Sequence, residues 1–273
     1  MAQLFTRLLL ATEGSEYDTG AERMAFAMAK RCQLPLATVV PLVSNPEYEA
    51  LAPQLAARAE QEAAQKIAKL KKQADDAKVQ IQLRVRRGEE PYFEIIDEAR
   101  ITNSEMIIIR RRGKRGLLAN LLVGEMVSKV VAHAPCHVLI VPPDASMWNK
   151  RVLVAVDTAD DGRSNVTIAA GVAAQCSVPL QIVSVVAADA LRSHAQNLVA
   201  QLVQLALDAG VQAQGEVRTG KPFTEILAAR EAGDCDLIVM GSRSDRRIGG
   251  AWVGGVAQMV MGLSAHPVMV LHS

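Results

Sequence analysis

Residue types that bind phosphate in α/β proteins are concentrated in one stretch near the end of the sequence, DCDLIVMGSRSDRRIGGAWVGG. An apolar run that ends at Met240 and Gly241 is typical of a buried strand. A polar, basic loop separates it from Gly254 and Gly255, and an apolar segment with helical spacing starts at Val256. This order of strand, loop and helix predicts backbone N–H groups that face an anion at the start of the helix.

A second stretch with the same organisation, EMIIIRRRGKRGLLANLLVG, extends from Glu105 to Gly124. The loops of the two stretches are basic, with Arg110, Arg111, Arg112, Lys114 and Arg115 in the earlier one and Arg243, Arg246 and Arg247 in the later one. These charges either form an anion-binding patch at the mouth of each site or pair with nearby Asp and Glu residues on a solvated loop. A net charge of +1 and an aromatic content of 3% argue against nucleic-acid binding through the same loops.

Other residues that could do chemistry lack the required spacing. The four cysteines have no CxxC pairing, so we expect reduced, buried thiols. Four of the histidines lie close to predicted helix and strand ends, where a favourable interaction with the helix dipole is more common than a metal site. No nucleophile elbow and no P-loop lysine is found in the sequence, so we expect neither a metal nor a set of catalytic residues.

Length and composition set the broad class. At 273 residues, half of them apolar, the chain can form two domains of ordinary size with substantial cores. The first apolar run is too short for a signal peptide, and no run approaches the roughly 18 apolar residues of a membrane helix. We therefore expect a cytoplasmic protein.

The first half of the chain alternates between strand and helix patterns. Short apolar or alternating runs predict strands at Leu8–Thr12, Leu36–Val43, Val79–Val85, Met106–Ile109 and Val138–Val141. A long amphipathic helix is predicted to end near Asp76, with Leu51, Leu55, Ala63, Ile67 and Leu70 on or near one face. Alternation of this kind is typical of a parallel sheet with right-handed crossovers.

The pattern then repeats. Asp157 stands 144 positions after Glu13, and Cys176 stands 144 positions after Cys32. Further along, Pro222 stands 131 positions after Pro91, and Gly254 stands 130 positions after Gly124. Because the offset falls from 144 to about 130 in the middle of the repeat, the sequence predicts a duplication whose second copy has a shorter second helix. Cys32 and Cys176 are then expected to be packing residues at the ends of matching helices.

The sequence therefore predicts domains at residues 1–145 and 150–273. The expected fold is α/β, with two tandem doubly wound, mainly parallel five-stranded sheets that carry helices on both faces and are related by a pseudo-twofold axis. In such sheets ligands bind at the carboxyl ends of the strands, which here are marked by Glu13 and Asp157.

Several of these features together resemble the universal stress protein family, and in particular its tandem, two-domain members. They are the acidic ends of the first strands (LLLATEGS and VLVAVDTA), the GEEP and GKP turns, the fourth strands with their loops, and the HAPCHVLIV and SAHPVMVL endings. The resemblance covers essentially the whole chain.

Nucleotide-binding members of that family have the pattern G-x2-G-x9-G-[S/T] in this loop. In the second copy Gly241 and Gly254 fit, Ser244 replaces the middle glycine, and Gly255 replaces the hydroxyl residue. The first copy departs further, because Arg110 replaces the first glycine and Glu125 the hydroxyl residue. The resemblance thus implies that the second domain holds the better site.

The resemblance implies a stress-response sensor or adaptor that binds ATP or AMP in the second domain. Asp157 would contact the adenosine, Met240, Gly241 and Ser244 would lie along the ligand, and Gly254, Gly255 and Val256 would hold the phosphate. The resemblance also implies an internal pseudo-dimer, in which the two repeats pair through their last strands. A homodimer of two chains is compatible with it, and the protein partner is unknown. The alternatives are an interaction protein that binds a protein partner or another anion through its basic loops, and at most a slow ATPase.

Overall fold

The computed structural model describes residues 4–45, 47, 51–111, 124–242 and 253–272. The chain divides into two compact units. The N-terminal unit contains the described residues of 5–111 and 124–147, and the C-terminal unit contains residue 4 and the described residues from 148 onward. Within the described residues, no helix is both long and apolar enough to cross a membrane.

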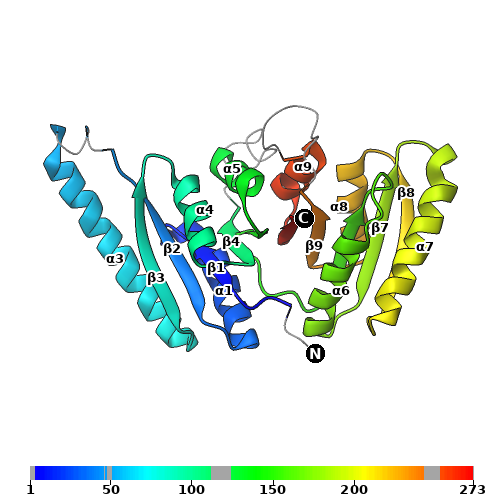
Figure 1. The fold of residues 1–273 in the computed structure, drawn as a ribbon, viewed down its shortest axis with the longest axis horizontal. Helices are drawn as coiled ribbons and strands as arrows, with labels where there is room; N and C mark the ends of the chain where they lie inside the picture. The colour runs from blue at the N-terminus through cyan, green and yellow to red at the C-terminus, as the bar shows by residue number, and fades with distance from the viewer. Residues whose placement is uncertain (1–3, 46, 48–50, 112–123, 243–252, 273) are drawn as a thin grey trace. The chain divides into compact units, whose positions relative to one another are not determined.

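The N-terminal unit alternates strands and helices along its length (Figure 1). Its elements are β1 (Leu8–Ala11), η1 (Glu16–Asp18), α1 (Thr19–Cys32), β2 (Leu36–Val43), α3 (Pro53–Ala77), β3 (Ile81–Gly88), α4 (Pro91–Ile101), β4 (Met106–Arg110), α5 (Glu125–His133) and β5 (His137–Val141). The strands lie in the order β3-β2-β1-β4-β5, and every pair is parallel. Helix α1 contacts α3, and α4 contacts α5, as expected when the chain winds in two directions from β1 and β4.

The C-terminal unit repeats this plan. Its elements are β6 (Val152–Val156), α6 (Arg163–Cys176), β7 (Leu180–Val186), η3 (Asp189–Leu191), α7 (Arg192–Asp208), β8 (Ala213–Thr219), α8 (Pro222–Ala232), β9 (Leu237–Gly241), α9 (Gly255–Leu263) and β10 (Val268–Leu271). The strand order is β10-β9-β6-β7-β8, again parallel throughout. The predicted α/β fold with two five-stranded parallel sheets is confirmed.

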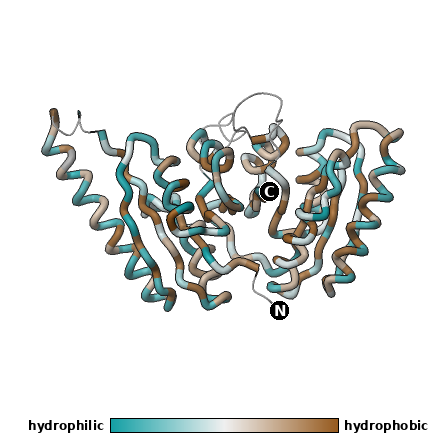
Figure 2. The backbone as a smooth tube through the Cα atoms, in the orientation of Figure 1, coloured by the Kyte–Doolittle hydropathy of each residue, from teal (hydrophilic) through white to brown (hydrophobic). Residues whose placement is uncertain are grey.

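Continuous apolar runs form the central strands because helices cover both faces of each sheet. Leu9 and Ile107 in the N-terminal unit are fully buried, as are Leu153 and Val239 in the C-terminal unit. Figure 2 shows hydrophobic residues gathered along these strands, whereas α3 is hydrophilic over much of its length. The central strands therefore form the rigid part of each unit, and the loops at their carboxyl ends are positioned by it.

Three sequence predictions need correction. Leu51 and Leu55 were predicted on or near the apolar face of the long helix, but Leu51 is 82% exposed and Leu55 is 64% exposed. Among the described side chains of α3 the first buried one is that of Ala63, so the start of this helix is not covered. The third strand starts at Ile81 and not at Val79, because the Val79 N–H bonds to the Ala74 carbonyl and closes the end of α3.

The cysteines at the matching helix ends are the third correction. Cys32 and Cys176 do end α1 and α6, but both are only partly buried, while Cys136 and Cys235 are buried. The residue after each helix, Gln33 or Ser177, adopts a left-handed conformation that turns the chain away. The chain therefore leaves the helix at the cysteine, which keeps its side chain at the margin of the core.

A buried carboxyl group distinguishes α1 from α6. Glu22 is 3% exposed, and its Oε1 accepts a hydrogen bond of 2.7 Å from the Thr12 hydroxyl. Burial raises the pKa of Glu22, with a smaller contribution from Asp18, while Thr12 and Lys69 act in the opposite direction. The matching positions in the C-terminal unit are Val156 and Val166, 144 residues further on.

The raised pKa of Glu22 predicts a pH-dependent stability. A raised folded pKa means that the contribution of this group is fully present below the ordinary value of 4.5 and declines as the pH rises through the folded pKa. The unfolding free energy of Glu22→Gln should therefore fall less than that of the wild type as the pH rises from 4.5 to neutrality. Denaturant titrations at several pH values measure this, with the exposed Glu89→Gln as the control. Identical pH slopes for wild type and Glu22→Gln would contradict it.

Candidate functional site

The chain reverses its winding direction at β6 and β9 of the C-terminal unit. These strands are parallel neighbours, paired from Val152 with Leu237 to Ala155 with Met240. The segment after β6 leads to α6, and the segment after β9 leads to α9. Loops that diverge from adjacent parallel strands leave a crevice at the carboxyl ends of the strands.

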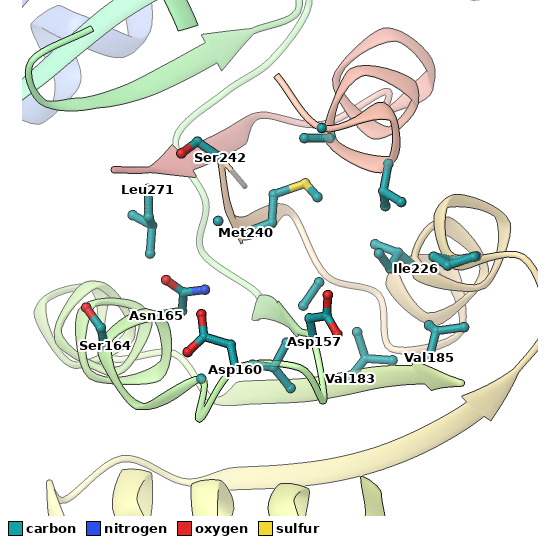
Figure 3. A pocket seen from close by; sticks show the side chains of 18 of the residues that line it. Asp157, Asp160, Ser164, Asn165, Val183, Val185, Ile226, Met240, Ser242 and Leu271 are labelled. Atoms are coloured by element: carbon teal, nitrogen blue, oxygen red, sulfur yellow. The ribbon is translucent and has the colours of Figure 1, made fainter. Parts of the chain in front are cut away.

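A cavity of about 770 Å³ occupies this position (Figure 3). Six of the predicted site residues line it: Asp157, Met240, Gly241, Gly254, Gly255 and Val256. The seventh, Ser244, lies outside the described residues, as do Arg243, Arg246 and Arg247. The volume lies in the range of roughly 300–1,000 Å³ that is common for small-molecule sites.

One wall of the cavity is apolar. Val183 and Val185 extend from β7, Ile226 and Pro222 from α8, and Met240 from β9. In Figure 3 the valines and Ile226 lie together on one side, with the carboxylate of Asp157 beside them. A flat apolar ring with a hydrogen-bond donor on its edge suits such a wall.

The first turn after β6 positions Asp157. Its Oδ1 accepts a hydrogen bond of 2.9 Å from the Ala159 N–H, and its carbonyl accepts one of 3.2 Å from the Asp160 N–H. Asp161 then accepts from the Arg163 N–H at the start of α6. These local bonds fix the loop, so the side chains that it carries have a defined direction.

The start of α9 supplies backbone donors. Gly254 is the N-cap of this helix, and no side chain among the described residues caps it. A Cβ at Gly255 would meet no atom within 4 Å, so the space beside the first turn is open. Uncapped N–H groups at the positive end of a helix favour an anion.

The opposite wall is polar and contains residues that the sequence reasoning missed. Asp160, Ser164 and Asn165 line the cavity from the start of α6. An added Cβ on Gly241 would lie 3.2 Å from the Asn165 Nδ2, so this amide faces the space that a side chain at position 241 would enter. Aligning the two repeats could have identified Asn165, because the matching residue in the first repeat is Ala21.

In the N-terminal unit a side chain fills the corresponding space. Arg110, at the end of β4, has a side chain only 5% exposed. Its guanidinium bonds to the Glu13 carboxylate at 2.8 Å, to Asp18 at 3.2 Å and to the Ser15 hydroxyl at 2.8 Å. Asp18 is itself 2% exposed at its side chain and also accepts from the Ser15 N–H and hydroxyl.

This cluster decides between the two sequence alternatives for Arg110, because the residue pairs with nearby Asp and Glu side chains. Arg110 does not contribute to an anion patch at the mouth of a site, because its charge is neutralised by the buried Asp18 carboxylate and by the partly exposed Glu13 carboxylate. The corresponding residues of the C-terminal unit are Gly241 for Arg110 and Gly162 for Asp18. Both members of the buried ion pair are thus glycine in the repeat that has the cavity.

The geometry does not suggest a metal centre. Among the described residues, no group of three or more His, Cys, Asp or Glu side chains is arranged to hold a metal ion.

Two parallel sheets, each with helices that follow its strands, define a tandem α/β protein. The universal stress protein family model matches residues 4–142 and 149–272, so the chain belongs to the universal stress protein family and contains two of its repeats. The predicted family is confirmed.

Individual proteins are also similar to this chain. Universal stress protein MJ0531 from Methanocaldococcus jannaschii is 27% identical over 146 residues, which is 50% of this chain and 82% of that protein. The structure of a universal stress protein from Archaeoglobus fulgidus DSM 4304 matches 98% of this chain and 97% of that chain, with a TM-score of 0.73 and 22% identity. An Archaeoglobus fulgidus universal stress protein in complex with dAMP matches 46% of this chain and 100% of that chain, with a TM-score of 0.39 and 22% identity.

The buried ion pair predicts a large coupling between Arg110 and Asp18. Arg110→Met leaves the Asp18 carboxylate buried without its cation and should cost about 3–5 kcal/mol of unfolding free energy. Adding Asp18→Asn, which keeps an oxygen for the Ser15 donors, should recover more than half of that loss. Denaturant unfolding of both variants measures the coupling.

The matched control is Arg58→Met, which breaks the exposed Arg58–Glu62 pair of α3 and should change stability little. Additive effects of Arg110→Met and Asp18→Asn would contradict the buried coupling.

Proposed function

We propose that the C-terminal unit binds an adenine nucleotide and that the protein acts as a nucleotide-responsive sensor or adaptor in the stress response. The observation that carries this proposal is the cavity at the ends of β6 and β9, which joins an apolar wall to the uncapped start of α9. A nucleotide needs both features, because its base is flat and largely apolar and its phosphate is anionic.

The apolar wall fits the base. Adenine placed against Val183, Val185 and Ile226 has its exocyclic amine available to the Asp157 carboxylate, which can only accept hydrogen bonds when ionised. Guanine presents a carbonyl oxygen at the corresponding edge, and two acceptors that face each other repel. The proposal therefore includes a preference for adenine over guanine.

The phosphate is assigned to the start of α9. The N–H groups after Gly254 have no side-chain cap, and the helix dipole adds a favourable positive potential there. Nine residues of helix support this dipole. The N-terminal unit is not assigned a nucleotide, because the Arg110 side chain occupies the matching space between Glu13 and Asp18.

Filling the cavity should abolish binding. In Gly241→Arg the new side chain enters the space that Arg110 fills in the other unit, and Asp157 is available to it as Glu13 is to Arg110. Isothermal titration calorimetry should detect one AMP per wild-type chain, weaker binding of GMP, and no AMP binding to this variant.

Ser193→Arg is the control, since it adds the same charge at an exposed position on α7 outside the cavity. An unchanged melting temperature shows that Gly241→Arg still folds. Equal AMP binding by wild type and Gly241→Arg, or no heat from AMP or ATP with the wild type, would contradict the proposal. The second result would favour an interaction protein that uses another ligand.

Restoring the hydroxyl group of the family pattern should strengthen binding. A side chain at position 255 meets open space, so Gly255→Ser places a new donor beside the phosphate without a clash. A hydrogen bond to a charged group is worth about 1.5–3 kcal/mol, so AMP should bind about tenfold more tightly or better. Gly255→Ala, measured alongside, separates the hydroxyl from the effect of adding a methyl group. Equal AMP affinities for the two variants would place the phosphate elsewhere.

A further inference from the structure

The cavity extends beyond the space that a base and a phosphate use. Its additional part, which we call the α6 lobe, is bounded by Asp160, Ser164, Asn165 and Gly241. Figure 3 shows the Asp160 and Asn165 side chains directed into the cavity from the α6 side, facing Met240 across the open space. The α6 lobe belongs to the same cavity as the apolar wall and the start of α9, so one ligand can occupy all three.

The N-terminal unit shows what chemistry the corresponding space favours. There the guanidinium of Arg110 donates hydrogen bonds to the Glu13 carboxylate, to Asp18 and to Ser15. In the C-terminal unit both members of the buried ion pair are glycine, Asp157 replaces Glu13, and Asp160, which matches Glu16, lines the cavity. A group that fills the α6 lobe must therefore donate hydrogen bonds to carboxylate oxygens.

Asn165 adds a second requirement. The Asn165 Nδ2 would lie 3.2 Å from a Cβ added to Gly241. This amide nitrogen donates hydrogen bonds and cannot accept them. Within the described part of the chain the Asn165 amide makes no hydrogen bond of its own. A group in the α6 lobe must thus accept from Asn165 and donate to Asp160. Hydroxyl groups do both, because one oxygen can donate to the Asp160 carboxylate or accept from the Asn165 Nδ2.

We propose that Asp160 and Asn165 are specificity-determining residues that recognise the 2′- and 3′-hydroxyl groups of a ribose. This inference rests on the proposed binding of an adenine nucleotide. With the base on the apolar wall and the phosphate at Gly254 and Gly255, the sugar between them lies over Met240 and Gly241, next to Asn165. One hydroxyl donates to the Asp160 carboxylate, and the other accepts from the Asn165 Nδ2.

The test compares AMP with 2′,3′-dideoxy-AMP by calorimetry on the full-length chain. The ratio of the two dissociation constants within one variant cancels any effect of a substitution on the phosphate. Wild type should bind AMP at least tenfold more tightly than the dideoxy nucleotide, because the latter lacks the hydroxyl contacts to both Asp160 and Asn165. Asn165→Ala and Asp160→Asn should each reduce this ratio several-fold and leave the dideoxy nucleotide binding nearly unchanged.

Asn197→Ala is the matched control, because Asn197 is exposed on α7 and does not line the cavity. It should retain the wild-type ratio. A wild-type ratio near one, or ratios for Asn165→Ala and Asp160→Asn equal to that of wild type, would overturn the inference while leaving the proposed function intact. Absence of binding of either nucleotide to wild type would overturn the proposed function, and the inference with it.

Discussion

The side chain at the last residue of the fourth strand determines what occupies the crevice of each repeat. This residue lies at the carboxyl edge of the sheet, beside the end of the first strand, where the helices diverge. An arginine at this position fills the crevice of the N-terminal unit and requires buried carboxylates to balance its charge. A glycine leaves the crevice of the C-terminal unit open and lets a polar amide face it. The other residue differences between the two crevices occur together with this exchange of arginine for glycine.

The compensation extends to the residues around the crevice. The N-terminal unit has the buried polar residues Asp18, Thr12 and Glu22 near Arg110, and the matching residues of the C-terminal unit are Gly162, Val156 and Val166. A buried arginine without these carboxylates would be strongly destabilising, and buried carboxylates without a cation would be as well. Arg110 and Asp18 of the N-terminal unit are therefore a matched pair, and a substitution of either one alone leaves a buried charge without its partner.

The opposite edge of each sheet has stayed alike. Glu105 accepts hydrogen bonds from the Thr6 and Arg7 N–H groups before β1. Asp236, 131 residues later, accepts from the N–H groups of Asn149, Lys150 and Arg151 before β6. Both units thus keep the same device for holding the start of their first strand. Divergence at the carboxyl edge and agreement at the amino edge are what we expect if the fold is common and ligand binding is confined to one repeat.

Much of this could be predicted from the sequence, because strand and helix periodicity and the duplication are local signals. The carboxyl-edge residues Asp157, Gly241 and Gly254 were identified by their position after a strand or before a helix, and they do line one cavity. Asp160 and Asn165 were missed because their importance depends on how the loop after β6 and the first turn of α6 face the cavity, which is a tertiary property. The sequence could not decide between an anion patch and acidic partners for Arg110, because Glu13 and Asp18 are distant in sequence and meet it only once β1 and β4 pair. Leu51 and Leu55 matched an amphipathic pattern, but nothing in that pattern tells how far the sheet extends beneath the helix.

A crystal structure of the protein grown with AMP would test the central claim most directly, because it locates the ligand in both repeats at once. The account predicts nucleotide density only in the C-terminal unit, with the base against Val183 and Ile226 and the phosphate at Gly255, and an Arg110 that still bonds to Glu13 and Asp18. Nucleotide bound in the N-terminal unit with Arg110 displaced, or an empty C-terminal cavity at saturating AMP, would contradict it.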